Sequence, residues 1–357
     1  MGTQIDQNGV MAALGTVMDP DLKRDLVSLR MVKDVKIEDS TVACTIELTP
    51  LHPRKAMIQE SVEKALLAVS GVSSAKLNFT VGVASGSSDL KQNLIPQVKN
   101  AIAVSSGKGG VGKTTVSVNL AVALAQGGAR VGLLDADIYG PNVPLMIGIH
   151  RQPELVGERI IPPENHGIKV MSIGFLVPDD TPIVWRGPMI HGAIQQFLKD
   201  VEWGELDYLL VDLPPGTGDA QLSIVQLVPL TGAVIVTTPQ EVSLLDSKKG
   251  LAMFQKAHVP VLGIVENMSY FVCGHCGERT EIFDYGGGKK AADKLGVPFL
   301  GEVPIDTAIR IGGDTGLPIV VSNPESKQSE AFRNISGEMA IRIQAATLGK
   351  VKLRIIN

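Results

Sequence analysis

Short continuous runs of apolar residues recur along most of the chain and are separated by stretches with helical spacing. The clearest runs are residues 101–104, 129–135, 208–212, 233–237 and 261–265. Runs of this kind are typical of strands buried on both faces, and intervening helices form the crossovers of a parallel sheet. The pattern predicts an α/β fold with a mostly parallel sheet and helices on both faces. The functional site is expected in loops at the carboxyl ends of the strands.

The first eighty residues show a different pattern, with fewer and shorter elements. The predicted elements are a helix over 5–17, strands over 27–37 and 41–48, a helix starting near Pro53, and a strand over 72–80. They predict a small α+β domain at residues 1–80. Residues 81–98 are rich in glycine and serine and contain Pro96, which indicates a linker. Residues 99–357 are then expected to form the α/β domain.

A phosphate-binding motif lies between the run at 101–104 and a predicted helix over 114–126. Residues 107–114, GKGGVGKT, match the P-loop pattern G-x-x-x-x-G-K-[ST]. In such a loop backbone N–H groups turn toward phosphate oxygens, Lys113 adds positive charge at the β- and γ-phosphates, and Thr114 offers a hydroxyl to Mg²⁺. The expected nucleotide contacts are Gly107, Lys108, Gly109, Gly110, Val111, Gly112, Lys113, Thr114 and Thr115.

Aspartates end two of the predicted strands near this loop. Asp135 and Asp137 close the run at 129–135, and Asp212 closes the run at 208–212. Carboxylates beside a phosphate site suit Mg²⁺ binding and the positioning of water. Helix capping or solvation in a loop is the alternative for each aspartate taken alone.

Two cysteines form a C-x-x-C pair, Cys273 and Cys276, whose spacing lets two thiolates hold one metal centre. Two ligands are half of a four-ligand site, and Cys44 is isolated in a predicted strand. A twofold dimer would supply the other half. Zn²⁺ and an iron–sulfur cluster both fit the spacing, and a metal-free thiol pair is the remaining alternative.

Composition narrows the class of protein. The net charge is −4 and no block of Lys or Arg is present, so we expect no nucleic-acid partner. No apolar run approaches the roughly 20 residues that span a bilayer, and the N-terminus lacks the features of a signal peptide. Three cysteines without a disulfide framework suggest a reducing compartment. We therefore expect a soluble, cytoplasmic protein without a membrane partner.

The second lysine of the P-loop, Lys108, makes the motif resemble the deviant P-loop of the MinD/ParA/nitrogenase-iron-protein ATPases. The resemblance implies a dimer in which Lys108 reaches the nucleotide of the other subunit. It also implies that Asp137 orients the attacking water, that Asp135 supports the metal region, and that Asp212 holds Mg²⁺ through water. Asn267 stands where this class reads the edge of adenine, and an amide offers the donor and acceptor that this base needs. Capping is the alternative for Asn267.

Motifs along nearly the whole chain resemble the Mrp/ApbC iron–sulfur carrier ATPases. They are residues 104–114, 135–141 (DADIYGP), 186–188 (RGP), 212–219 (DLPPGTGD), 237–240 (TTPQ) and 266–268 (ENM), followed by C-x-x-C. The family implies an ATPase and a homodimer with a labile [4Fe–4S] cluster on Cys273 and Cys276, which it passes to apo-proteins. We expect slow ATP turnover, because a switch depends on the lifetime of its ATP state.

The N-terminal residues 19–21 and 27–32 resemble the SufT-like iron–sulfur assembly domain. That family usually has a cysteine in the turn before the second helix, and this chain has His52 there. Imidazole binds clusters differently from thiolate. The departure puts thiolate-mediated cluster relay through this domain in doubt. His52 could still ligate metal, but we expect it to be structural or vestigial.

A positioning or partition ATPase of the ParA/MinD type, with a structural zinc at C-x-x-C, is the alternative function. It requires a basic DNA-binding face or an amphipathic C-terminal helix. Residues 350–355 alternate charged and apolar side chains, which predicts a strand rather than a helix, and the C-x-x-C pair has no clear role in such a switch. A reductase like the nitrogenase iron protein is disfavoured by the number and spacing of the cysteines.

Overall fold

The computed structural model describes residues 5–86, 93–138, 140–176 and 187–354. It divides the chain into two compact units, one of Met1–Val83 with Ala340–Asn357 and one of Ala84–Met339. Part of the expected linker, residues 87–92, lies outside the described residues, as do Tyr139 and Arg186 of the family motifs. The domain boundaries expected from the sequence, 1–80, 81–98 and 99–357, stay a prediction. They place residues 340–357 in the second domain, whereas the contacts group these residues with the first unit.

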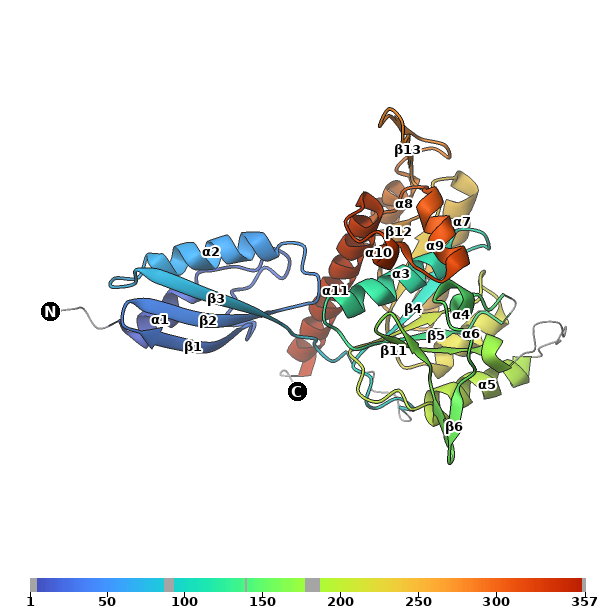
Figure 1. Cartoon of the computed structure of the whole chain (residues 1–357), viewed down its shortest axis with the longest axis horizontal. Coiled ribbons are helices and arrows are strands. Elements are labelled where there is room, and N and C mark those ends of the chain that lie inside the picture. Colours follow the sequence, from blue (N-terminus) through green and yellow to red (C-terminus); the bar gives the residue numbers. More distant parts are fainter. Residues whose placement is uncertain (1–4, 87–92, 139, 177–186, 355–357) are drawn as a thin grey trace. The chain divides into compact units, whose positions relative to one another are not determined.

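Residues 5–83 of the N-terminal unit form two helices and a three-stranded sheet (Figure 1). Its elements are α1 (Gln7–Leu14), β1 (Val32–Glu38), β2 (Thr41–Leu48), α2 (Lys55–Leu67) and β3 (Ser74–Val81). β1 pairs antiparallel with β2, and β2 pairs in parallel with β3. Every second side chain of β2 is buried, and these residues share a core with the apolar residues of α1 and α2. The predicted small α+β region is confirmed.

The strand predicted over residues 27–37 is wrong in its first part, because β1 begins only at Val32. Arg30 has a φ of +57°, in the left-handed region, and the N–H of Met31 donates to the carbonyl of Leu26 at 3.0 Å. These features form a turn, which a strand pattern of apolar residues does not reveal.

An eight-stranded sheet forms the centre of the second unit. Its strands are β4 (Ala101–Ser106), β5 (Val131–Asp135), β8 (Glu164–Asn165), β9 (Ile168–Ser172), β10 (Tyr208–Asp212), β11 (Leu230–Thr237), β12 (Val261–Glu266) and β15 (Phe299–Glu302). The order is β15-β12-β11-β4-β10-β5-β9-β8. All neighbours are parallel except the short β8, which runs antiparallel to β9. The predicted mostly parallel sheet is confirmed.

Helices cover both faces of this sheet (Figure 1). Their bounds are α3 (Lys113–Gln126), α4 (Val143–Met146), η1 (Ile173–Leu176), α5 (Gly187–Asp200), α6 (Asp219–Leu227), α7 (Glu241–Lys256), α8 (Gly287–Leu295), α9 (Thr307–Thr315), α10 (Ile319–Ser322) and α11 (Lys327–Arg354). Helices α5 to α8 share one apolar core with side chains of the central strands. Helix α3 packs on the opposite face, where it contacts β4, β5 and β10. The P-loop therefore lies between a buried strand and a buried helix.

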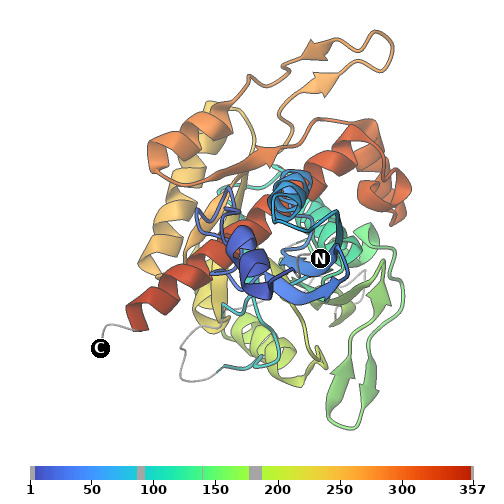
Figure 2. The same cartoon turned by 90° about the vertical axis from the view of Figure 1, so that its left-hand side faces the viewer.

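Two small hairpins project from the second unit in both views (Figures 1 and 2). One consists of β6 (Glu154–Val156) and β7 (Arg159–Ile161), and the other of β13 (Phe271–Val272) and β14 (Arg279–Thr280). The second hairpin carries the C-x-x-C pair at its tip.

The strand predicted over residues 350–355 is wrong through Arg354, because α11 continues to that residue; Ile355 lies outside the described residues. Helix growth adds one hydrogen bond per residue to an existing helix, and Lys, Leu and Arg are good helix formers. This removes the strand argument against the ParA/MinD alternative.

No helix in the described parts of the chain has the length and apolar character needed to cross a membrane.

Candidate functional site

The loop between β4 and α3 borders a cavity of about 510 Å³, within the usual range of small-molecule sites. Gly110 and Gly112 both have a φ of +78°, a conformation that side chains other than glycine rarely adopt. The expected site residues that line this cavity are Gly109, Gly110, Val111, Gly112, Lys113, Thr114, Thr115 and Asp137. The structure thus brings most of the predicted P-loop residues to one hollow.

Lys113 is held at the cavity by carboxylates from two strand ends. Its Nζ lies 2.7 Å from Asp212 Oδ2 and 3.5 Å from Asp137 Oδ2. The hydroxyl of Thr114 donates to the same Asp212 oxygen at 2.8 Å, and that of Ser117 donates to Asp212 Oδ1 at 2.5 Å. Asp212 is fully buried. The positive charge of Lys113 balances its negative charge, and each carboxylate oxygen accepts a hydrogen bond from a hydroxyl group.

Asp135 is also fully buried and lies at the end of the strand beside β10. The Ser172 hydroxyl donates to its Oδ2 at 2.8 Å, and the N–H of Asp137 donates to its Oδ1 at 3.1 Å. Burial raises the pKa of Asp135, and the nearby charge of Asp212 raises it further. Three predicted carboxylates therefore gather around one lysine, while their individual roles in Mg²⁺ binding and water positioning stay predictions.

The side chain of Asn267 forms a hydrogen bond with the backbone of the P-loop. Its amide nitrogen donates to the carbonyl of Val111 at 2.8 Å, and both residues are buried. A Cβ on Gly112 would lie 2.2 Å from that nitrogen, so the loop packs closely on this side chain. The sequence did not predict this contact, and the adenine contact expected for Asn267 stays a prediction.

Gly107 and Lys108 are not among the described residues that line the cavity. A Cβ on Gly107 would lie 2.3 Å from the backbone carbon of Asp246, so close packing against α7 requires glycine there. Lys108 is half-buried, and its carbonyl accepts a hydrogen bond from Ser106 at 2.9 Å. The expected reach of Lys108 to a second subunit stays a prediction.

Backbone hydrogen bonds close the turn that carries the two cysteines of the hairpin. The N–H of Gly277 donates to the carbonyl of Cys273 at 2.8 Å, and the N–H of Cys273 donates to that of Glu278 at 2.9 Å. Backbone N–H groups of Cys276 and His275 donate to the Cys273 sulfur and lower the pKa of its thiol, and the Cys276 thiol lowers it further. Cys276 is exposed and Cys273 is half-buried, so both thiols lie at the outer end of the hairpin.

Cys44 differs from this pair in every respect. It is buried in β2 within the core of the N-terminal unit. Burial raises the pKa of its thiol to about 11, which keeps it protonated and unsuited to metal ligation. The sequence expectation that Cys44 stands apart from the C-x-x-C pair agrees with this position.

The base of the hairpin is clamped by Arg279. Its guanidinium lies 3.7 Å from the ring centre of Tyr270 and 4.4 Å from that of Tyr285, distances typical of cation–π contact. It also pairs with Glu302 of β15 at 3.5 Å. These contacts tie the two arms of the hairpin to the edge of the sheet.

Several residues at the cavity were not predicted from the sequence. Arg310 and Asp314 of α9 line its wall and form an ion pair at 2.5 Å. Leu145 and Met146 of α4 line it as well. No motif marks these residues; the one available signal is that α9 follows β15 at the carboxyl edge of the sheet, where ligands bind in such folds.

A parallel sheet, a P-loop leading into a buried helix, and aspartates at adjacent strand ends together define a P-loop NTPase. Three similarities to known proteins extend this conclusion. The chain is 52% identical over 348 residues to the iron–sulfur cluster carrier protein of Synechocystis, covering 96% of this chain and 99% of that one. The nucleotide-binding protein of Archaeoglobus fulgidus, solved in complex with ADP and with cobalt, is 44% identical with a TM-score of 0.58, covering 66% and 93%.

The cell division ATPase MinD of Pyrococcus furiosus is 28% identical with a TM-score of 0.53, covering 67% of this chain and 98% of that one. Family models match as well: NUBPL iron-transfer P-loop NTPase over residues 97–340, and iron–sulfur cluster assembly protein over residues 7–79. The chain belongs to the family of NUBPL-type iron-transfer P-loop NTPases, and it carries an iron–sulfur cluster assembly domain at its N-terminus.

Proposed function

We propose that this protein is an ATP-binding and ATP-hydrolysing carrier of iron–sulfur clusters. The observation that carries the proposal is the pair of half-buried Cys273 and exposed Cys276 at the tip of a hairpin of an iron-transfer P-loop NTPase. Backbone N–H groups lower the pKa of Cys273, and the thiolate is the form that binds metal. The relative from Synechocystis is named as a carrier of the same kind.

The number of cysteines available in one chain implies that the cluster is held by a homodimer. The whole chain has three cysteines, and Cys44 is buried with a raised pKa. One chain therefore offers two thiolates, whereas a [4Fe–4S] cluster takes four. Two copies related by a twofold axis supply the four ligands, with the labile cluster bridging them.

The nucleotide site has the groups that ATP hydrolysis needs. Lys113 faces the cavity and would neutralise phosphate charge. Thr114, and Asp212 through water, would hold Mg²⁺, and Asp135 would support the metal region. Asp137 lines the cavity beside Lys113 and positions the attacking water. Lys108 of the second copy adds a cation to the transferred phosphate. Turnover is slow, because a switch depends on the lifetime of its ATP state.

ATP and cluster act together in this proposal. Binding and hydrolysis change the geometry of the dimer and so the affinity of the cysteines for the cluster, which passes to apo-proteins in the cytoplasm. The ParA/MinD alternative with a structural zinc is less well supported, because the matching family model and the Synechocystis relative are both of the iron-transfer or iron–sulfur carrier kind.

Anaerobic reconstitution with iron and sulfide tests the proposal. We expect a dimer by size-exclusion chromatography with one [4Fe–4S] chromophore, which Cys273→Ala or Cys276→Ala removes and Cys44→Ala leaves intact. A full cluster on a monomer, or a requirement for Cys44, would contradict the bridging arrangement. Stoichiometric zinc in protein purified without oxygen would favour a structural metal site instead.

A further inference from the structure

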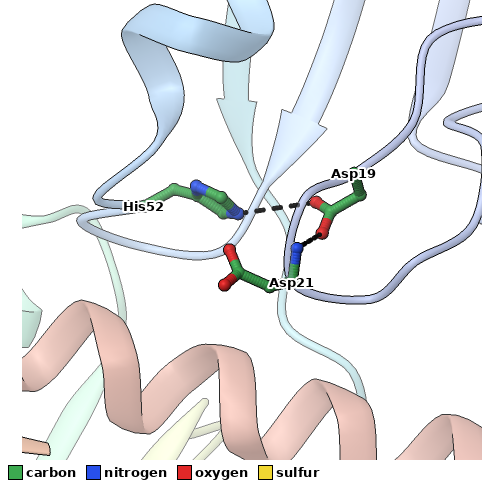
Figure 3. A group of neighbouring side chains, drawn as sticks. All are labelled: Asp19, Asp21 and His52. Carbon is green, nitrogen blue, oxygen red and sulfur yellow. Dashed lines mark hydrogen bonds and ion pairs between the residues drawn. The ribbon is translucent and has the colours of Figure 1, made fainter.

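Three side chains with metal-binding chemistry meet within the N-terminal unit (Figure 3). Asp19 and Asp21 lie in the turn after α1, and His52 lies in the turn before α2. One ligand atom from each residue lies within 4.8 Å of those of the other two. The Nε2 of His52 points at Asp19 and is 3.6 Å from its Oδ2.

The carboxylate of Asp19 is fully buried and only half satisfied. Its Oδ1 accepts hydrogen bonds from the N–H groups of Asp21 at 2.9 Å and Leu22 at 2.7 Å. Its Oδ2 is buried and has no hydrogen-bond partner among the described residues, since 3.6 Å to His52 is too long for a hydrogen bond. Buried polar atoms of this kind are normally satisfied by a water or an ion.

The unsatisfied Oδ2 of Asp19 faces the Nε2 of His52 at 3.6 Å, and the carboxylate of Asp21 lies beside both. A buried anionic oxygen that faces an imidazole nitrogen and a second carboxylate is an environment that favours a cation.

We propose that Asp19, Asp21 and His52 form a binding site for a divalent transition-metal ion of the zinc and ferrous class. One imidazole nitrogen with two carboxylate oxygens is a mixed ligand set that these ions accept. At bond lengths of about 2.1 Å, ligand atoms lie about 3.5 Å apart, so the side chains close slightly on the ion. Three ligands leave an open position for water or exchange. The site rests on these contacts alone and is independent of the proposed carrier function.

Two contacts of Arg54 oppose metal binding and lower its affinity. The guanidinium donates to Asp21 Oδ2 from Nε at 2.7 Å and pairs with it through Nη2 at 2.5 Å. The backbone N–H of Arg54 donates to His52 Nδ1 at 3.3 Å, and a metal on Nε2 would place the imidazole proton on Nδ1 and end that bond. The bond is long, and the ion pair is partly exposed, so both are weak.

A metal-free network is the competing explanation. In it His52 turns an Nε2–H toward Asp19 while Nδ1 accepts from the backbone of Arg54, and the guanidinium of Arg54 pairs with Asp21. The two explanations differ in what Arg54 does. In a metal site Arg54 competes with the ion for Asp21, so its removal strengthens metal binding, whereas in a metal-free network its removal creates no site.

Cobalt titration of the full chain distinguishes them. Cys273→Ser and Cys276→Ser together provide the parent protein, so that the exposed thiols do not bind Co²⁺. Without nucleotide and under argon, we expect about one Co²⁺ per chain with visible ligand-field bands and no thiolate charge-transfer band. His52→Ala should abolish this binding, whereas Asp137→Asn, the matched control at the nucleotide cavity, should retain it. Circular dichroism checks that each variant folds.

Two further variants give positive signals. His52→Cys should restore binding with a thiolate-to-cobalt band in the near ultraviolet, which only a direct ligand produces. Arg54→Gln should raise the affinity for Co²⁺ by up to about 5-fold, as the loss of a partly exposed ion pair implies. Absence of Co²⁺ binding in the parent, binding that survives His52→Ala, or no thiolate band in His52→Cys would each overturn the proposal.

Discussion

Replacing Asn267 by alanine tests how the P-loop keeps its phosphate-binding shape. The side chain donates one hydrogen bond, from its amide to the carbonyl of Val111 at 2.8 Å, and the loop packs on it at Gly112. Alanine removes the donor and leaves a gap into which the loop can relax. We expect Asn267→Ala to weaken binding of any ligand that the P-loop holds by its phosphates.

The magnitude follows from the burial of this contact. Asn267 is 5% exposed and Val111 is 1% exposed, so water does not readily replace the lost donor. A buried group left without its partner costs about 1–3 kcal/mol. If the cost falls on the phosphate-binding conformation, the Kd for Mg·ATP rises by about 5- to 150-fold. Asn267→Asp should lose more, because a carboxylate cannot donate and adds negative charge beside the carbonyl.

Isothermal titration with two ligands separates loop bracing from adenine recognition. Mg·ATP carries the base, whereas magnesium triphosphate does not. Bracing by Asn267 predicts that the variant loses affinity for both ligands by a similar factor. Asn93→Ala is the matched control: Asn93 accepts a hydrogen bond from the N–H of Ile95 at 3.0 Å in the same unit, and its loss should leave both affinities unchanged.

A loss confined to Mg·ATP, with triphosphate binding as in the parent, would refute the bracing role and support adenine contact as the function of Asn267. Unchanged affinity for both ligands would refute both roles. Thermal unfolding of each variant shows whether the fold itself has changed.

Three further predictions concern hydrolysis, the hairpin and thiol reactivity. Asp137→Asn should bind Mg·ATP but release phosphate about 100-fold more slowly, because an amide positions water poorly; phosphate release at the parental rate would remove Asp137 from the mechanism. Arg279→Ala should release the base of the hairpin, so a chelator should strip a reconstituted cluster faster without changing its stoichiometry; equal stripping rates would count against a clamp. At pH 8 iodoacetamide should label Cys273 but not Cys44 in native protein, since a thiol with a pKa of about 11 is about 0.1% thiolate at that pH; rapid labelling of Cys44, read by mass spectrometry, would contradict its burial.

The central sheet and the P-loop were predictable because each leaves a local pattern in the sequence. Buried parallel strands read as continuous apolar runs, and the predicted run at 208–212 coincides with β10 (Tyr208–Asp212). Because parallel strands end at one edge, the aspartates at these ends were expected together, and Lys113 does contact Asp137 and Asp212. The sequence was therefore enough to predict a site wherever apolar periodicity located the strands and the parallel topology brought their ends together.

Contacts between distant segments were not predictable in the same way. Ser117 of α3 donates to Asp212 at the end of β10 at 2.5 Å, and Arg310 of α9 lines the cavity although it lies far from the P-loop in the sequence. His52 and Asp19 come from different turns, and sequence alone left His52 as a structural residue. The strand predicted at 350–355 failed because a six-residue alternation carries less weight than the long helix that precedes it.

The segment after β12 joins the nucleotide loop to the cysteine hairpin within a few residues. Asn267 holds Val111 of the P-loop, and the chain then runs through Ser269, whose N–H donates to Val303 at 2.9 Å. The carbonyl of Tyr270 accepts from Ile305 at 2.7 Å, and β13 with Cys273 follows directly.

A nucleotide that moves the P-loop therefore acts on a segment that is hydrogen-bonded at both ends of this path. The nucleotide can change the affinity for the cluster only if it binds the two geometries of the dimer, with tight and with weak cluster binding, unequally. The cluster must then change the affinity for the nucleotide by the same factor. With the coupling typical of such systems, about 1–3 kcal/mol, Mg·ATP affinity should differ by about 5- to 150-fold between apo and cluster-loaded dimers. The Asp137→Asn variant, which slows hydrolysis, allows both affinities to be measured under argon. Equal affinities would mean that ATP acts on the recruitment of recipient proteins and does not change the affinity of the cysteines for the cluster.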